Sequence, residues 1–342
     1  MKRQIFMSLL LLFVTLLMPL LFIPFGGTSA LADEPPEEEP LKDGDDPHTE
    51  SDGVLFEQTR DGDFIFTALT DGVLREYSME DYLLGVLAAE MPASFEPEAL
   101  KAQAVAARTF ILNRVIHASP NHPDAAVCDD HTCCEAFINL NSMRAKWGAD
   151  YAEYLEKLKD AVRGTDGQVL LFEGEPILAA FHSSSAGQTE SSAAVWSDRP
   201  YLVSVSSPET DSDVPNYVST VEVSTDDFKK TICAAYPQAE FPQDPGNWLS
   251  TPAIDAGGRV GNMSIGGVNV SGTTLRSLFS LRSTAFTLEY TGNSFLFTVT
   301  GYGHGVGMSQ YGANVMAKQG ATYKEILAHY YPGSELTDAM QK

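Results

Sequence analysis

The sequence has 342 residues, of which 44% are hydrophobic, and a formal net charge of −24 at pH 7. A chain of this length and composition can bury one large core or two moderate ones. The acidic balance argues against a nucleic-acid surface, because such surfaces neutralise phosphates with Lys and Arg. It also argues against a basic patch that would bind anionic lipid.

Residues 1–32 have the pattern of a membrane segment. Lys2 and Arg3 precede residues 5–25, which carry no charge and are long enough to cross a bilayer as a helix with its N-terminus inside. The competing interpretation is a cleaved signal peptide, because residues 30–32, Ala-Leu-Ala, resemble a cleavage site. The length favours a retained single-pass anchor. Either interpretation places the rest of the chain outside the cytoplasm.

Residues 33–53 are acidic and rich in proline, with almost no apolar content. Such a segment cannot bury enough apolar surface to fold, and it predicts an extended linker. The remaining residues, 54–342, are expected to form one extracytoplasmic domain.

Within that domain, β-rich runs broken by Asp-Gly pairs predict hairpins over residues 54–78. Residues 79–87 are apolar at helical spacing, and residues 97–116 predict a helix with proline in its first turn. Further predicted elements are helices over 150–162, 224–236 and 324–331, strands over 168–182 and 286–302, and glycine-rich β-structure with a short helix over 260–278. This irregular mixture predicts an α+β fold with mainly antiparallel strands around a substrate cleft.

Glu90 is the candidate catalytic residue. It lies among apolar neighbours in Ala-Ala-Glu-Met-Pro, just before the helix predicted from residue 97. Desolvation penalises a carboxylate, so a carboxyl group in such surroundings keeps its proton to higher pH. A general acid that works near neutral pH needs this property.

A glycine-rich motif follows far downstream. Residues 301–313, GYGHGVGMSQYGA, hold five glycines around His304, and Gln310 and Tyr311 come next. Glycine lets the backbone approach a ligand closely, and these polar side chains suit a ligand rich in hydroxyl groups. A tight loop between a strand and a helix is the plainer interpretation of the glycines alone.

A serine-rich motif offers similar chemistry. Residues 181–190, FHSSSAGQTE, contain Ser183, Ser185 and Gln188 and are followed by aromatic residues. Amides and hydroxyls of this kind could bond sugar oxygens, although a polar surface loop has the same composition. No G-x-S-x-G hydrolase signature is present.

Taken in order, these motifs resemble the stage II sporulation protein D family, which includes amidase-enhancer proteins. The resemblance rests on AAEMP with KAQAVAARTF, FHSSSAGQTE with VWSDRPYL, GTTLRSLFSLRSTAF, GYGHGVGMSQYGA and HYYPGSEL. It covers the chain from about residue 54 onward.

The resemblance implies a membrane-anchored lytic transglycosylase that cleaves peptidoglycan glycan strands after their stem peptides have been removed. Its implied partners are stage II sporulation proteins P, an amidase, and M, in engulfment of the forespore. The implied location is the mother-cell membrane facing the forespore, with residues 54–342 as the catalytic domain. No organic cofactor is expected.

Glu90 matches the family's catalytic glutamate. It would protonate the bond between N-acetylmuramic acid (MurNAc) and N-acetylglucosamine (GlcNAc), then accept the C6 hydroxyl proton, leaving a 1,6-anhydroMurNAc end. Glu190 is a candidate for a second acidic group, because many glycosidases use two. The residues expected to bind substrate, partly from the resemblance and partly from composition, are Lys101, Arg108, Ser183, Ser185, Gln188, Tyr201, His304, Gln310, Tyr311, Tyr330 and Tyr331.

A cysteine cluster predicts a structural zinc site. His122, Cys128, Cys133 and Cys134 offer four zinc-competent ligands within a short span. Some family members carry a similar His/Cys site in this loop, and His131 could replace Cys133. Four protein ligands would leave no open position for catalysis by the metal.

Two alternatives for the cysteines stay open. Cys128 could form a disulfide with Cys134, or a member of the cluster could pair with Cys233, since the compartment permits oxidation. The thiols could also be free.

Two other functions compete with the transglycosylase. A non-catalytic protein of the same fold could bind glycan and stimulate an amidase. A zinc-dependent peptidase or amidase would need an open metal site and a different response to loss of Glu90.

Overall fold

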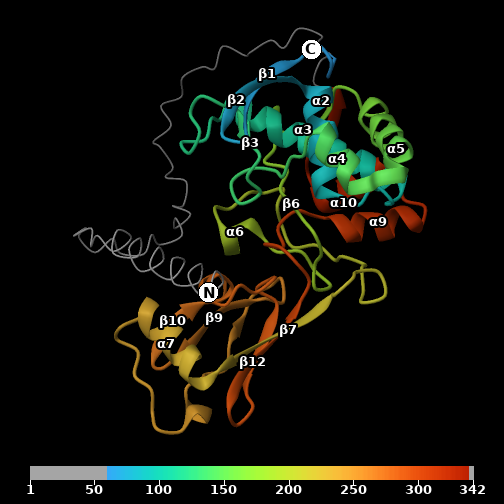
Figure 1. Cartoon of the computed structure of the whole chain (residues 1–342). Helices are drawn as coiled ribbons and strands as arrows, with labels where there is room; N and C mark the ends of the chain where they lie inside the picture. The colour runs from blue at the N-terminus through green and yellow to red at the C-terminus, as the bar shows by residue number, and fades with distance from the viewer. Residues whose placement is uncertain (1–59, 339–342) are drawn as a thin grey trace, which may run out of the picture. The chain divides into compact units, whose positions relative to one another are not determined.

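The computed structural model describes residues 60–338 (Figure 1). The predicted anchor and linker, residues 1–32 and 33–53, lie outside the described residues. Between residues 60 and 338, no helix combines the length and apolar character that a bilayer crossing requires.

The described chain builds two hydrophobic cores. The first core uses chain segments from both ends of residues 60–338. Its elements are β1 (Ile65–Thr70), β2 (Val73–Ser78), α2 (Met79–Glu90), α3 (Pro97–Ile116), β3 (Val127–Cys128), α4 (Leu140–Trp147), the 3-10 turn η2 (Gly148–Asp150), α5 (Tyr151–Arg163), β4 (Gln168–Phe172), β5 (Glu175–Pro176), β6 (Phe181–His182), α6 (Ser192–Val195), β13 (Met308–Ser309), α9 (Gln310–Lys318), α10 (Tyr323–Tyr330) and β14 (Glu335–Asp338).

Helix α3 is the centre of the first core. It packs against α2, α5, α9, α10 and β4. Its buried residues lie on every side of the helix, and five of them are alanines. Small alanine side chains let the neighbouring helices approach α3 closely. Pro97 at the first turn has no N–H to leave unsatisfied there.

Short strands complete the first core. β1 and β2 form a hairpin whose turn residues, Asp71 and Gly72, have φ of 51° and 71°. These are the left-handed angles that a two-residue Asp-Gly hairpin turn requires. β6 pairs in parallel with β13, which joins segments from the middle and the end of the chain.

The second core lies between β6 and β13 in the sequence. Its elements are β7 (Val218–Ser224), α7 (Thr225–Ala235), η3 (Pro245–Asn247), β8 (Ala253–Ile254), β9 (Val260–Ile265), β10 (Val268–Ser271), α8 (Gly272–Leu278), β11 (Phe286–Tyr290) and β12 (Ser294–Thr300).

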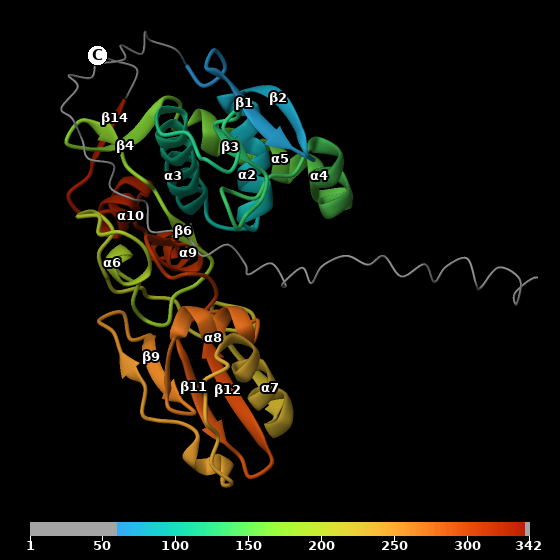
Figure 2. The ribbon, with the colours of Figure 1, turned by 90° about the vertical axis from the view of Figure 1, so that its left-hand side faces the viewer.

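These strands form two three-stranded antiparallel sheets, in the orders β11-β12-β7 and β10-β9-β8. Helix α7 packs on β7 and β12, and Figure 2 shows it beside β12. Phe228 of α7 stacks on Phe295 and Phe279, with ring centroids 4.0 Å and 5.2 Å apart. This aromatic cluster fills the second core.

The mixture of helices and mainly antiparallel strands agrees with the predicted α+β class. Several details differ from the predictions, and strands β7 and β14 and the short helix α6 were not among the predicted elements. Helix α2 continues to Glu90, three residues beyond the predicted end, and residues 168–182 form three short strands in place of two. Helix α4 was not predicted from the sequence.

Candidate functional site

Glu90 is the last residue of α2, and its side chain is half-buried. The backbone N–H of Ala136 donates a hydrogen bond of 2.7 Å to its Oε1, and Gln310 Nε2 donates one of 3.3 Å to its Oε2. Burial raises the pKa of Glu90, and these two donors offset only part of that rise. The carboxyl group therefore keeps its proton to higher pH than an exposed glutamate does.

Gln310 reaches Glu90 because it begins α9 directly after β13. Ser309 caps this helix by accepting a hydrogen bond of 3.1 Å from the backbone N–H of Gly312. Gln310 is buried, so its side-chain amide is shielded from solvent, and the start of α9 fixes where that side chain lies. The sequence prediction of Gln310 as a sugar ligand is untested, but the structure brings it to the candidate catalytic carboxyl.

Two more charged groups act on Glu90, and Glu90 in turn acts on the nearby Glu135. His131 and Lys146 lower its pKa, and Lys146 donates a hydrogen bond of 2.7 Å to the carbonyl of Ala88. Glu135 is buried, and neither carboxyl oxygen has a hydrogen-bond partner within residues 60–338. Burial raises the pKa of Glu135 well above its ordinary value, and Glu90 adds to that rise.

The serine-rich loop is partly built into the protein interior. Ser185 is buried, where its hydroxyl lies 2.7 Å from His182 Nε2 and its N–H donates to Glu209. Ser183 is half-buried and its carbonyl accepts a hydrogen bond of 3.0 Å from the N–H of Tyr311. Gln188 is exposed.

In the glycine-rich motif, four glycines have positive φ, at positions 301, 303, 305 and 307. The His304 ring is tilted by 54° against the Trp196 ring, with ring centroids 4.9 Å apart, and its Nδ1 accepts a hydrogen bond of 3.1 Å from Val306 N–H. Burial and the charges of Arg276 and Arg259 lower the pKa of His304 to about 3. His304 is therefore neutral at physiological pH.

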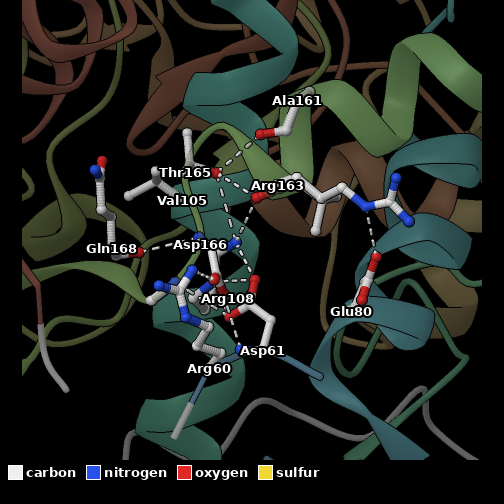
Figure 3. A network of polar contacts seen from close by, with 12 residues as sticks. Arg60, Asp61, Glu80, Val105, Arg108, Ala161, Arg163, Thr165, Asp166 and Gln168 are labelled. Carbon is white, nitrogen blue, oxygen red and sulfur yellow. Dashed lines mark hydrogen bonds and ion pairs between the residues drawn. The ribbon is translucent and has the colours of Figure 1, made fainter. Parts of the chain in front are cut away.

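The two basic residues of α3 lie in different surroundings. Lys101 pairs with Glu98 at 2.7 Å on the helix surface. Arg108 is fully buried, and its Nε donates to Asp61 Oδ1 at 2.8 Å while its Nη1 donates to the carbonyl of Gln168 at 3.0 Å (Figure 3). The structure thus holds Arg108 by internal contacts.

Three of the four predicted tyrosines are buried. Tyr201 Oη accepts a hydrogen bond of 3.1 Å from Leu178 N–H, and Tyr331 Oη donates to the carbonyl of Ala180 at 2.8 Å. Tyr330 Oη lies 2.8 Å from Ser207 Oγ. Tyr311 is half-buried and packs edge-on against Phe95, with ring centroids 4.9 Å apart.

The candidate metal ligands do come together. One ligand atom from each of His122, Cys128, Cys133 and Cys134 lies within 4.8 Å of the others, and His131 is not in this group. In a tetrahedral zinc site, neighbouring sulfur ligands are about 3.8 Å apart, given a Zn–S distance of about 2.3 Å. A small contraction would therefore satisfy the metal.

The protonation of these ligands also suits a metal. His122 Nδ1 lies 2.9 Å from the carbonyl of Ala125, which fixes the proton on Nδ1 and leaves Nε2 free as a ligand, 3.2 Å from Cys134 Sγ. A hydrogen bond from the Cys134 thiol lowers the pKa of Cys128 to about 6. The four cysteines are all unpaired in the described structure.

Comparison with known proteins identifies the class. The family model described as "Stage II sporulation protein" matches residues 70–172. The chain is 39% identical over 263 residues to stage II sporulation protein D of Bacillus amyloliquefaciens, covering 76% of this chain and 74% of that protein. It is 38% identical over 270 residues to stage II sporulation protein D of Bacillus subtilis (strain 168), covering 76% and 75%.

The chain therefore belongs to the stage II sporulation protein D family. It is also 29% identical over 307 residues to a protein named amidase enhancer from Bacillus subtilis (strain 168), covering 75% of this chain and 40% of that protein. The family assignment confirms the resemblance carried by the sequence motifs.

Three polar groups around the site could not be found from sequence motifs. The Ala136 N–H is a backbone group, and Glu135 and Glu209 stand alone in segments of irregular structure. Only the position of Glu135 directly after Cys134 connects it to a motif.

Proposed function

We propose that the protein is a lytic transglycosylase that cleaves the MurNAc–GlcNAc bond of peptidoglycan strands lacking stem peptides, during sporulation. The observation that carries this proposal is Glu90, a half-buried carboxyl group with a raised pKa and two hydrogen-bond donors that fix its orientation. The family's link to sporulation supports the biological setting.

The proposed chemistry uses one carboxyl group twice. Protonated Glu90 gives its proton to the glycosidic oxygen as the C1–O4 bond breaks, and the leaving GlcNAc takes that proton away as its 4-hydroxyl. The carboxylate then accepts the proton of the MurNAc C6 hydroxyl while that oxygen bonds to C1. The product is a 1,6-anhydroMurNAc end, and Glu90 finishes protonated.

The local contacts fit both halves of this cycle. A raised pKa makes proton donation possible near neutral pH. Once ionised, the carboxylate keeps the Ala136 N–H and the Gln310 amide as hydrogen-bond donors. Charge-assisted hydrogen bonds of this kind stabilise an anion in a partly buried site.

The experiment is product analysis by mass spectrometry. Purified full-length protein, wild type or Glu90→Gln, is incubated with peptide-free glycan strands. The matched control is Glu156→Gln, an exposed glutamate on α5. We expect 1,6-anhydroMurNAc ends with wild type and the control, and a loss of at least about 100-fold with Glu90→Gln, the scale of general acid–base catalysis. Full activity of Glu90→Gln would overturn the assignment.

Zinc is proposed as a structural group held by His122, Cys128, Cys133 and Cys134, whose donor set fits it. Bound there, it would cross-link the loop and take no part in bond cleavage. Cys134 is two residues before Ala136, so the same loop supplies the N–H that contacts Glu90.

The setting proposed for the protein is a single-pass anchor in the mother-cell membrane facing the forespore. The proposed partners are stage II sporulation proteins P and M. An amidase partner would generate the peptide-free strands on which this enzyme acts, and the name of the amidase enhancer supports a connection with amidase activity.

That name also favours a second candidate function, a non-catalytic glycan-binding protein that stimulates an amidase. If the protein has this function, neither the wild type nor Glu90→Gln produces 1,6-anhydroMurNAc ends. It also predicts faster stem-peptide release by the partner amidase when the wild-type protein is added.

A further inference from the structure

Glu209 is a buried carboxylate with no part in the chemistry described above. Its side chain is 2% exposed. Oε1 accepts hydrogen bonds from Ser185 N–H at 2.6 Å and from the Ser309 hydroxyl, and Oε2 accepts one from the Ser207 hydroxyl at 2.5 Å. A buried charge is stable only when such donors replace its water.

The three donors come from three separate chain segments. Ser185 belongs to the serine-rich loop after β6, Ser207 precedes the second core in sequence, and Ser309 ends β13. Ser207 also lies 2.8 Å from Tyr330 Oη of α10. Glu209 thus binds together parts of the chain that are far apart in sequence.

The first turn of α9 is packed directly on this cluster. A Cβ at Gly312 would lie 2.7 Å from Glu209 Oε2 and 2.5 Å from Ser207 Oγ, and closer still to Tyr330 Oη. No side chain fits there without displacing the cluster. The absence of a Cβ lets the helix begin in contact with Glu209.

Ser309 connects this cluster to Glu90. Its hydroxyl donates to Glu209, while the same oxygen accepts from Gly312 N–H and caps α9. The next residue, Gln310, donates from Nε2 to Glu90 Oε2 at 3.3 Å. The chain of contacts therefore runs Glu209, Ser309, Gln310, Glu90.

We propose that Glu209 is a positioning residue: it fixes the Ser309 cap and thereby holds the Gln310 amide against Glu90. This role explains why a carboxyl group is buried at the start of α9. The kinetic part of the inference rests on the proposed transglycosylase function, but the contact between Gln310 and Glu90 does not.

The proposal predicts a change at Glu90 itself. The hydrogen bond from Gln310 lowers the pKa of Glu90, as do Ala136 N–H, His131 and Lys146, and Glu135 is the carboxyl that interacts with it. If the Gln310 amide moves away while the other groups stay, the pKa of Glu90 rises further. A purely structural role for Glu209 would not produce this shift.

The test is an NMR titration of the Glu90 carboxyl carbon in the full chain, assigned by its loss in Glu90→Gln. Three variants are compared: Glu209→Gln, Gln310→Met and the double variant. We expect an upward pKa shift of equal size in both single variants and no further shift in the double variant. The control is Glu222→Gln, which changes another glutamate that accepts a hydrogen bond from a serine, Ser294, but lies exposed on β7, and it should leave the pKa of Glu90 unchanged.

The kinetic arm measures cleavage of peptide-free glycan. We expect kcat of Glu209→Gln to fall about tenfold, the scale of a lost hydrogen bond to a charged group, with KM changed less than about twofold, because substrate contacts are retained. In the plot of cleavage rate against pH, the alkaline limb should shift to higher pH in both single variants.

Ser309→Ala covers the case in which Glu209→Gln does not fold. It removes the cap but leaves the bonds from Ser185 and Ser207 to Glu209, and it should raise the pKa of Glu90 as Gln310→Met does. An unchanged Glu90 pKa in folded Glu209→Gln or Ser309→Ala would overturn the proposal, as would a shift that adds to that of Gln310→Met. A shifted pKa in a protein that makes no anhydro ends would support the positioning role and overturn the transglycosylase alone.

Discussion

The N–H of Ala136 donates a hydrogen bond of 2.7 Å to Oε1 of Glu90, across 46 positions of sequence. Ala136 follows the last Cys of the His/Cys cluster by two residues. The segment that carries the candidate metal ligands therefore also supplies a hydrogen-bond donor to the candidate catalytic carboxyl. The conformation of that loop therefore determines whether Glu90 Oε1 keeps its hydrogen bond from the Ala136 N–H.

This relationship predicts that loss of a cysteine ligand weakens catalysis as well as stability. Cys134→Ser should lose bound zinc, unfold at a lower temperature and cleave glycan at least about tenfold more slowly, because the loop no longer fixes the Ala136 N–H. Metal analysis, thermal unfolding and product formation measure the three effects. Cys233→Ser, outside the cluster, is the control and should match wild type. A zinc-free wild-type protein, or a disulfide found in unreduced peptides, would contradict the zinc assignment.

The buried pair of Arg108 and Asp61 predicts a large effect on stability. The two side chains are 0% and 4% exposed, and Asp61→Ala would leave the guanidinium buried without its partner. We expect a loss of about 3–5 kcal/mol in the free energy of unfolding, measured by urea denaturation.

Arg60 provides the comparison, because it makes an ion pair with Asp166 from a side chain that is 83% exposed (Figure 3). Arg60→Ala should cost less than about 1 kcal/mol. Equal costs for the two variants would show that burial of the Arg108 pair is unimportant.

Glu190 predicts a pH-dependent contribution to stability. Burial and the nearby Asp255 raise the pKa of Glu190 to about 7. The folded protein therefore keeps this proton up to about pH 7, while the unfolded chain loses it near pH 4.5. Stability from this group is complete below about pH 4.5 and is lost as pH rises towards 7.

Glu190→Gln removes that titration. Its free energy of unfolding, relative to wild type, should rise between about pH 4.5 and 7 by up to about 3 kcal/mol, since one pKa unit corresponds to about 1.4 kcal/mol. Chemical denaturation at several pH values measures this difference. Glu76→Gln, on exposed β2, should give no such trend. A constant difference between wild type and Glu190→Gln across this range would contradict the prediction.

At Gly307 we expect an added side chain to destabilise the protein by a steric clash, beyond the strain that its positive φ alone would cause. Its φ is +71°, and a Cβ there would overlap the carbonyl oxygen of Ala180 and approach Tyr331 to 3.3 Å. Gly320 has φ of +94°, with no atom within 4 Å of a Cβ. Gly307→Ala should therefore destabilise the protein by at least about 1–3 kcal/mol more than Gly320→Ala. Equal thermal midpoints would show that the backbone near Ala180 relaxes freely.

The sequence predicted what local patterns encode. The Asp71-Gly72 turn, the long helix from Pro97 and the end of a helix near Glu90 all follow from turn chemistry, propensity and apolar spacing. Helix α4 was not predicted because only Met143 of its eight residues is buried, so it lacks a clear apolar face.

The site was predicted less completely, because its partners come from distant segments. A motif marks Glu90, but nothing local shows that Ala136 N–H and Gln310 meet it. Tyr330 and Tyr331 were expected in a cleft, and the structure buries both rings. An aromatic residue near a chain turn looks the same in sequence whether it binds a ligand or fills a core.

The contact between Gln310 and Glu90 spans 220 positions, with the whole second core between them. Chains are synthesised from the N-terminus, and domains tend to fold in that order. Glu90 and its helix are complete long before Gln310 leaves the ribosome. A nascent or truncated chain therefore carries the acidic residue without its final arrangement, and the protein acquires its complete site only when synthesis is nearly finished.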